Sequence, residues 1–200
     1  MMRSIRKSTQ AGMVLITTML LLVVVTILAL AMFRGAGLQE RIAGNTMEKQ
    51  RALQAAVSTQ QYAEQWLVTN VQSSPAVDCS GTGSPSTSAV TICSDILANS
   101  LDHGPVANVP WTIGGNQVGY SYNPTNTTTG LNYFPISTSG GINTYAGAPV
   151  VYISELGQDG TLANAVDYGV DAWSYAGATS TVAVVESTYQ IRYISKPPGP

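Results

Sequence analysis

The sequence lacks positive charge over most of its length. No Lys or Arg occurs between Arg51 and Arg192, and nine carboxylates lie in that interval. A protein that binds nucleic acid needs basic side chains to neutralise phosphates, so the composition argues against a nucleic-acid partner. Cations and basic protein surfaces suit this acidic stretch better.

Groups that usually carry catalysis are scarce as well. His103 is the only histidine, and no nucleophile motif lies near it. The chain has no GxSxG elbow and no Gly-rich loop of phosphate-binding form. We therefore expect no enzyme activity, no catalytic residue and no cofactor.

One uncharged run dominates what is present. Met13 to Phe33 contains 21 residues without a charged side chain. At about 1.5 Å per residue, such a helix spans roughly the 30 Å of a bilayer core. Arg3, Arg6 and Lys7 precede it, so the leader should stay cytoplasmic and the rest should be exported.

The sequence alone leaves three interpretations of this run open. It is a stop-transfer helix, a signal peptide cut after Ala29-Leu30-Ala31, or a prepilin segment. Gly12, directly before the run and behind basic residues, is similar to the cleavage site of type IV prepilins. Cleavage there keeps the hydrophobic helix and makes Met13 the mature N-terminus.

The segment that follows resembles PilX-type minor pilins of type IV pili. That family combines a GxVL-type start, a Leu/Val-rich span and a motif of the form LQERxAGN…RxAxQAA. The C-terminal "STVAVVESTYQIRY" is similar to the family's final strand. The residues that match the motif are Leu38, Gln39, Glu40, Arg41, Ala43, Gly44, Asn45, Arg51, Ala52, Gln54, Ala55 and Ala56.

The resemblance implies a structural subunit that helps to prime pilus assembly. It implies a leader at residues 1–12, cleavage and N-methylation at Gly12 and Met13, and a filament-core helix over 13–34. The implied partners are prepilin peptidase, the major pilin and other minor pilins, with a tip adhesin as a further candidate. The protein would sit in the inner membrane with a periplasmic C-terminal domain before it enters the pilus.

Thr17 departs from the pilin pattern. Most pilins place a Glu here, which is thought to neutralise the N-terminal amine of a neighbouring subunit. Without this Glu, the amine of the neighbouring subunit would be buried unpaired, which is costly. The missing Glu therefore argues against a repeating subunit and favours a tip position. A tolerated helix residue at this site is the plainer alternative.

The helix should continue over 35–74. Apolar residues follow helical spacing along one stripe, and Pro75 ends the helix. Gly35, Gly37 and Gly44 predict either a hinge or close helix packing. The expected packing face comprises Leu53, Ala56, Val57, Ala63 and Leu67, with Trp66 and Val71 on the same stripe.

The sequence predicts a loop-rich connecting region over residues 75–149. Short apolar runs, "VTIC", "VPWTI", "VGYSY" and "LNYFPI", predict brief strands. Cys79 and Cys93 are an even pair in an exported domain and predict a disulfide. Its loop would stabilise the fold by about 3 kcal/mol in the chain-entropy model.

The sequence pattern typical of strands is clearer over residues 150–194 than over residues 75–149. "APVVYISEL", "VDYGVDAWSY" and "TSTVAVVESTYQIRYI" predict strands, the last two as a hairpin. In the last strand, odd-numbered residues from Val185 to Tyr193 share one face and even-numbered residues from Glu186 to Arg192 share the other. One of these faces should meet the helix. Residues 195–200 form a tail. The predicted fold is α+β: a long N-terminal helix, membrane-spanning in its first half, packed on an antiparallel sheet.

No metal site is expected. Asp159, in the turn "ELGQDGTL", is a weak calcium candidate together with Asp167 or Asp171, although the spacing is not that of an EF-hand. Two functional classes remain open besides the minor pilin. One is a membrane-anchored or secreted binding module that uses loops 75–149, adhesin-like in character, and the other is a type II secretion pseudopilin.

Overall fold

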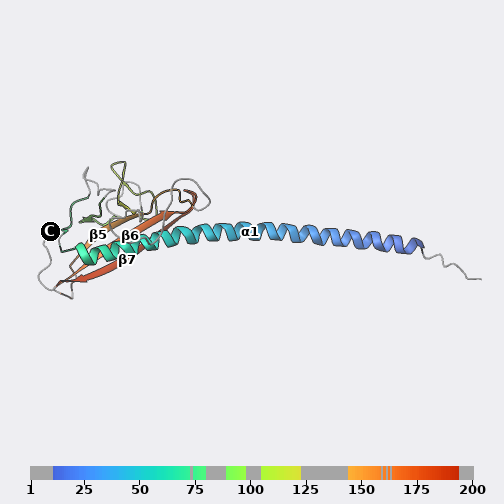
Figure 1. Ribbon diagram of the computed structural model, residues 1–200, viewed down its shortest axis with the longest axis horizontal. Helices are drawn as coiled ribbons and strands as arrows, with labels where there is room; N and C mark the ends of the chain where they lie inside the picture. The colour runs from blue at the N-terminus through green and yellow to red at the C-terminus, as the bar shows by residue number, and fades with distance from the viewer. Residues whose placement is uncertain are drawn as a thin grey trace, which may run out of the picture. The chain divides into compact units, whose positions relative to one another are not determined.

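The computed structural model describes residues 11–72, 74–79, 89–97, 105–122, 144–158, 160, 162 and 164–193. The chain divides into two compact units, residues 1–46 and 47–200. The described residues of the first unit are all helical, and the second unit contains the end of that helix and the strands that the structure describes. Figure 1 shows the last turns of α1 beside the long strands of the second unit.

Helix α1 runs from Ala11 to Asn70. It contains no proline, and the first proline of the chain is Pro75, which cannot continue a helix. The backbone N–H of Val71 still donates to the Leu67 carbonyl at 3.0 Å. The helix passes through Gly37 and Gly44 without interruption, and no atom lies within 4 Å of a Cβ placed on either glycine.

Three long strands form the centre of the sheet. They are β5 (Val150–Gln158), β6 (Ala165–Tyr175) and β7 (Val182–Arg192), paired antiparallel in that order. The backbone bonds from Ala176 N to Thr181 O and from Thr181 N to Ala178 O close the turn of the β6–β7 hairpin. This hairpin is the one that the sequence predicts.

Short strands complete the sheet on the far side of β5. There β1 (Ile92–Cys93) pairs parallel with β5, and β4 (Tyr120–Ser121) pairs antiparallel with it. The sheet is therefore mixed, with an antiparallel centre. A separate two-stranded sheet joins β2 (Thr112–Ile113) to β3 (Asn116–Gln117). The run "LNYFPI" lies outside the described residues.

The sheet carries a hydrophobic core on each face. On one face, side chains of α1 meet alternate residues of all three long strands. On the other, the Cys79–Cys93 region and Trp111 cover the remaining residues of β5 and β6. The first core contains Ala63, Leu67, Val71, Ile92, Val151, Ile153, Val166, Tyr168, Val170, Ala172 and Tyr193; the second contains Cys79, Cys93, Leu97, Trp111, Ile113, Val118, Val150, Tyr152 and Trp173.

Alternation along β7 follows the predicted pattern. Ser187, Tyr189 and Ile191 are partly buried and Tyr193 is buried, whereas the even-numbered residues from Glu186 to Arg192 are exposed. Tyr189 and Ile191 pack against the core that contains Ala63 and Leu67 of α1. The odd-numbered side of β7 therefore faces the helix.

Candidate functional site: helix α1 and its contacts with the sheet

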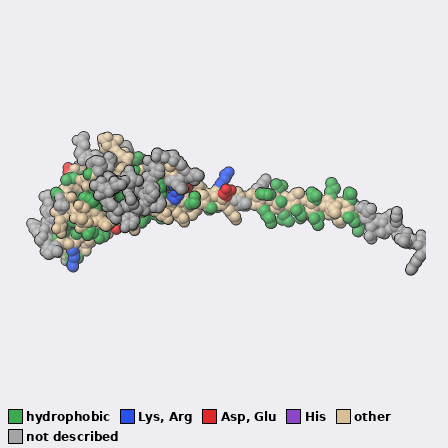
Figure 2. All heavy atoms as spheres, in the orientation of Figure 1, with side chains coloured by type: hydrophobic (Ala, Val, Ile, Leu, Met, Phe, Trp, Pro, Cys, Tyr) green, Lys and Arg blue, Asp and Glu red, His purple; other side chains and the backbone are tan. Residues whose placement is uncertain are grey.

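The first part of α1 is an apolar surface without cover. Every described side chain from Met13 to Phe33 is exposed, and Met13 is 74% exposed. Figure 2 shows these hydrophobic side chains around the helix. In length and composition, α1 is the one helix among the described residues that could cross a membrane, with a mean hydropathy of 2.9 in its most apolar window.

Hydroxyl groups within this apolar stretch bond to their own helix. Thr17 Oγ1 lies 3.1 Å from the Met13 carbonyl and 2.9 Å from the Val14 carbonyl, to which it can donate. Thr18 and Thr26 donate in the same way to the carbonyls of Leu15 and Val23. Because each hydroxyl already donates to a carbonyl of its own helix, placing it in an apolar environment costs little free energy. Thr17 brings no charge to this surface.

The processing positions lie at the start of α1. Gly12 and Met13 are both helical, and the leader up to residue 10 lies outside the described residues. Cleavage after Gly12 and methylation of Met13 stay predictions.

Small residues make up much of the buried face of α1 in the second unit. Ala56, Ala63 and Leu67 are fully buried, and Val57 is partly buried. Ala52, Ala55 and Thr59 are buried on the same face, although Thr59 is polar and does not belong to the apolar stripe. Its hydroxyl donates to the Ala55 carbonyl at 2.8 Å, which allows its burial.

The assignment of Leu53 to this face is wrong, because Leu53 is 47% exposed. The buried stripe runs through Ala52, Ala56, Ala63 and Leu67, and adjacent residues on a helix differ by about 100°. Leu53 therefore lies outside the stripe that begins at Ala52. The prediction gave weight to the large apolar side chain of Leu53, whereas the fully buried positions beside it, Ala52 and Ala56, hold alanine.

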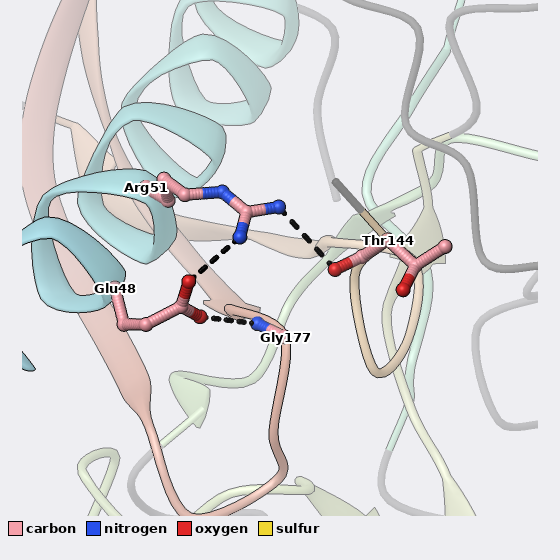
Figure 3. A network of polar contacts seen from close by, with 4 residues as sticks. All are labelled: Glu48, Arg51, Thr144 and Gly177. Carbon is pink, nitrogen blue, oxygen red and sulfur yellow. Dashed lines mark hydrogen bonds and ion pairs between the residues drawn. The ribbon is translucent and has the colours of Figure 1, made fainter. Parts of the chain in front are cut away.

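A polar cluster ties the first turns of α1 in the second unit to two loops. Glu48 Oε1 pairs with Arg51 Nη1 at 2.7 Å, and Glu48 Oε2 accepts the backbone N–H of Gly177 at 2.8 Å. Arg51 Nη2 donates to the Thr144 carbonyl at 3.3 Å. Figure 3 shows this cluster of Glu48, Arg51, Thr144 and Gly177, called the Glu48 network below.

Electrostatics and stacking reinforce the Glu48 network. The Gly177 N–H, followed by Arg51, lowers the pKa of Glu48, so its carboxylate stays charged. The Arg51 guanidinium lies 4.9 Å from the centre of the Tyr145 ring. Further along the helix, Glu64 Oε1 accepts a 2.8 Å hydrogen bond from Ser187 of β7. The sequence marked Arg51 through the PilX motif, but Glu48 had no comparable signal.

The predicted disulfide between Cys79 and Cys93 is present, and both residues are fully buried. Val77 pairs with Cys93 in a parallel bridge, which places the disulfide beside β1. Trp111 and Trp173 meet edge to face in the same core, with ring centres 6.3 Å apart. Both tryptophans are core residues.

Asp167 and Asp171 do not meet. Both lie on β6, four residues apart, so their Cα atoms are separated by about 13 Å. Asp167 accepts a hydrogen bond from Gln190 at 2.9 Å, and Asp171 lies opposite Glu186. Burial, followed by Glu186, raises the pKa of Asp171 to about 7.

Asp159 and His103 lie outside the described residues, so a calcium site that joins Asp159 to either aspartate stays a prediction. Within the described part of the chain, no three His, Cys, Asp or Glu side chains are placed to hold a metal ion.

The comparison with known families bears directly on α1. Residues 11–56 match the family model described as PilX N-terminal. This segment is similar to the N-terminus of PilX-type pilins. The match confirms the resemblance seen in the sequence and spans the apolar surface, Thr17 and the Glu48–Arg51 pair. No curated protein and no solved structure matches the chain.

The PilX match has a consequence for the role of the chain. PilX-type pilins are structural subunits of type IV pili, so the match supports a membrane-anchored pilus component that contacts other pilus proteins. Ala52, Ala55 and Ala56, which belong to the PilX-type segment, pack within the second unit. One part of the segment thus serves the protein's own fold, and the apolar part remains uncovered.

Proposed function

We propose that this protein is a minor pilin that helps to prime type IV pilus assembly and lies at or near the filament tip. The observation that carries the proposal is the PilX N-terminal match over residues 11–56. The apolar surface from Met13 to Phe33 supports it, because such a helix suits first a bilayer and then an apolar filament core.

Thr17 supports the tip position. Its hydroxyl bonds to carbonyls of its own helix, so it offers no carboxylate to the terminal amine of a neighbouring subunit. A repeating shaft subunit would then bury that amine without a counter-charge, which is costly. A subunit with no neighbour above it avoids this cost.

The charge of the second unit supports partners other than copies of itself. Between Arg51 and Arg192 the chain contains only carboxylates as charged groups, so identical copies would repel one another. We infer that the contacts are made with the major pilin and other minor pilins, with a tip adhesin as a further candidate. The role is one of assembly, without catalysis.

Processing is tested by mass spectrometry of the protein extracted from membranes. We expect cleavage between Gly12 and Met13, a methylated Met13 amine, and a periplasmic second unit. Gly12→Val should retain the leader and block entry into filaments. A mature chain that starts at Met32 would establish a signal peptide instead.

Filament position is tested in cells. Deletion of the gene should reduce surface pili while the major pilin remains in the membrane, and immunogold should label filament ends sparsely. Abundant labelling along the shaft would contradict the tip position. Normal piliation in the deletion strain would favour a separate adhesin-like binding module, and a secretion defect with normal pili would favour a type II pseudopilin.

Thr17→Glu gives a sharper test of the same proposal, because it restores the usual pilin carboxylate. At a tip position the new carboxylate has no amine to meet, so incorporation should not improve. Improved incorporation along the shaft would show that Thr17 impairs incorporation and does not indicate a tip position.

A further inference from the structure

A small hollow lies at the end of β7. Its lining residues are Leu162, Asn164, Arg192 and Tyr193, and its volume is about 280 Å³. This volume is just below the usual range of small-molecule sites, so the hollow suits a group of side-chain size. We call it the Arg192 pocket.

Arg192 is the only Lys or Arg from residue 52 to residue 195, an interval with nine carboxylates. An arginine in such surroundings is expected to pair with one of them. Across the described residues, however, the salt bridge that forms is Glu48–Arg51. Among the residues that the structure describes, Arg192 therefore has no ion-pair partner.

The strand register explains why Asp167, which lies diagonally across from Arg192 on β6, does not pair with it. On β6, Asp167 lies directly opposite Gln190, whereas Arg192 lies opposite Ala165. Gln190 Nε2 donates to Asp167 Oδ1 at 2.9 Å. Asp167 is therefore engaged by its direct neighbour, and the diagonal Arg192 is left beside the pocket.

The walls of the pocket are held in place by the fold. The Tyr193 backbone N–H donates to the Asn164 carbonyl at 2.8 Å, which joins the end of β7 to the chain before β6. The Tyr193 ring is buried, and its hydroxyl shares a 2.7 Å hydrogen bond with the hydroxyl of Tyr168. The lining thus offers the Arg192 guanidinium and the Asn164 amide as donors, and none of the four described residues that line it is acidic.

We propose that the Arg192 pocket binds a carboxylate group. The planar guanidinium presents paired N–H donors that match the two oxygens of a carboxylate. A single positive charge balances one negative charge, and the acidic surroundings disfavour polyanions such as phosphates. The carboxylate has two possible sources, an acidic side chain of a neighbouring protein or a free organic acid. This inference stands whether or not the chain is a pilin.

The binding chemistry is tested with sodium glutarate and the full chain in detergent. At concentrations several times Kd, glutarate should raise the Tm by about 2–4 °C over sodium chloride of equal ionic strength. Arg192→Gln should abolish this rise, and Arg192→Lys, which keeps the charge but loses the planar fork, should reduce it. Lys49→Gln, which removes an exposed charge outside the pocket, should preserve it.

No rise in the wild-type protein, or an equal rise in Arg192→Gln, would overturn the proposal. If circular dichroism shows that Arg192→Gln does not fold, Arg192→Lys provides the test instead. A glutarate-induced rise in Tm that is as large in Arg192→Lys as in the wild-type protein would then overturn the proposal. A photo-reactive residue at position 164 then distinguishes the sources in cells. Cross-links to another protein beside an Asp or Glu, lost in Arg192→Gln, identify a protein carboxylate, and a glutarate response without cross-links identifies a free acid.

Discussion

The carboxylate of Glu48 accepts the backbone N–H of Gly177 at 2.8 Å, across 129 residues of sequence. This bond joins helix α1 to the turn between β6 and β7. Arg51, bound to the same carboxylate, reaches the Thr144 carbonyl before β5. One acid on the helix therefore positions both loops at this end of the sheet.

Glu48→Gln should destabilise the second unit by about 1–2 kcal/mol, because the charge-assisted bonds to Gly177 and Arg51 are weakened. The measurement is the free energy of unfolding in denaturant at neutral pH. Lys49→Gln is the matched control, since its exposed side chain lies next to Glu48 in sequence. Equal stability of the Glu48→Gln and wild-type proteins would show that the network contributes nothing.

Asp171 predicts a pH dependence of stability. Its pKa is raised from 3.8 to about 7, so the native state keeps a proton that the unfolded chain has lost. Stability should therefore fall as the pH rises from about 4 to 7. Asp171→Asn should remove this dependence and gain on the order of 1–3 kcal/mol at pH 8, measured by unfolding at pH 5 and pH 8.

Glu186→Gln separates the two causes that raise the pKa of Asp171. It removes the neighbouring charge and leaves the burial of Asp171 unchanged, and burial is the larger cause. Part of the pH dependence should remain. An Asp171→Asn protein with the wild-type pH dependence would assign the effect to another group.

Gly119→Ala should cost about 2–4 kcal/mol. Gly119 has a φ of 96°, and a Cβ there would lie 2.7 Å from Val150 Cγ1 and 2.8 Å from the Val151 carbonyl oxygen. Gly44→Ala is the control, because it meets no atom within 4 Å and should favour the helix by about 1 kcal/mol. Thermal unfolding of both variants compares them directly, and a neutral Gly119→Ala would contradict the steric argument.

Loss of the disulfide should destabilise the fold by about 3 kcal/mol, because it closes a loop between residues separated by 14 positions. The comparison is between the wild-type protein and a variant with Cys79→Ala and Cys93→Ala, unfolded in urea. Reductant should lower the midpoint of the wild-type protein and leave the variant unchanged. Free thiols in the unreduced wild-type protein would refute the pairing.

Local patterns predicted much of this fold. The length of the uncharged run and the proline after the helix predicted α1, and two-residue alternation predicted the strands of the β6–β7 hairpin. Each of these patterns depends only on neighbours in sequence. Leu53 was misplaced because the pattern gives weight to apolar size, whereas the buried residues in this part of α1 are Ala52, Ala55 and Ala56.

Several contacts between distant residues escaped prediction. The bond from Gly177 to Glu48, the parallel pairing of β1 with β5 and the pocket at Arg192 each join segments that lie far apart in the chain. No local pattern carries that information.

Strand β6 has a consequence for how the protein unfolds. Val170 faces the helix-side core and Trp173 faces the disulfide-side core, so one strand belongs to both. Neither core can lose its packing on β6 without exposing the strand that the other core needs. We therefore expect a single cooperative unit, in which oxidation of the cysteines on one face secures the docking of the helix on the opposite face.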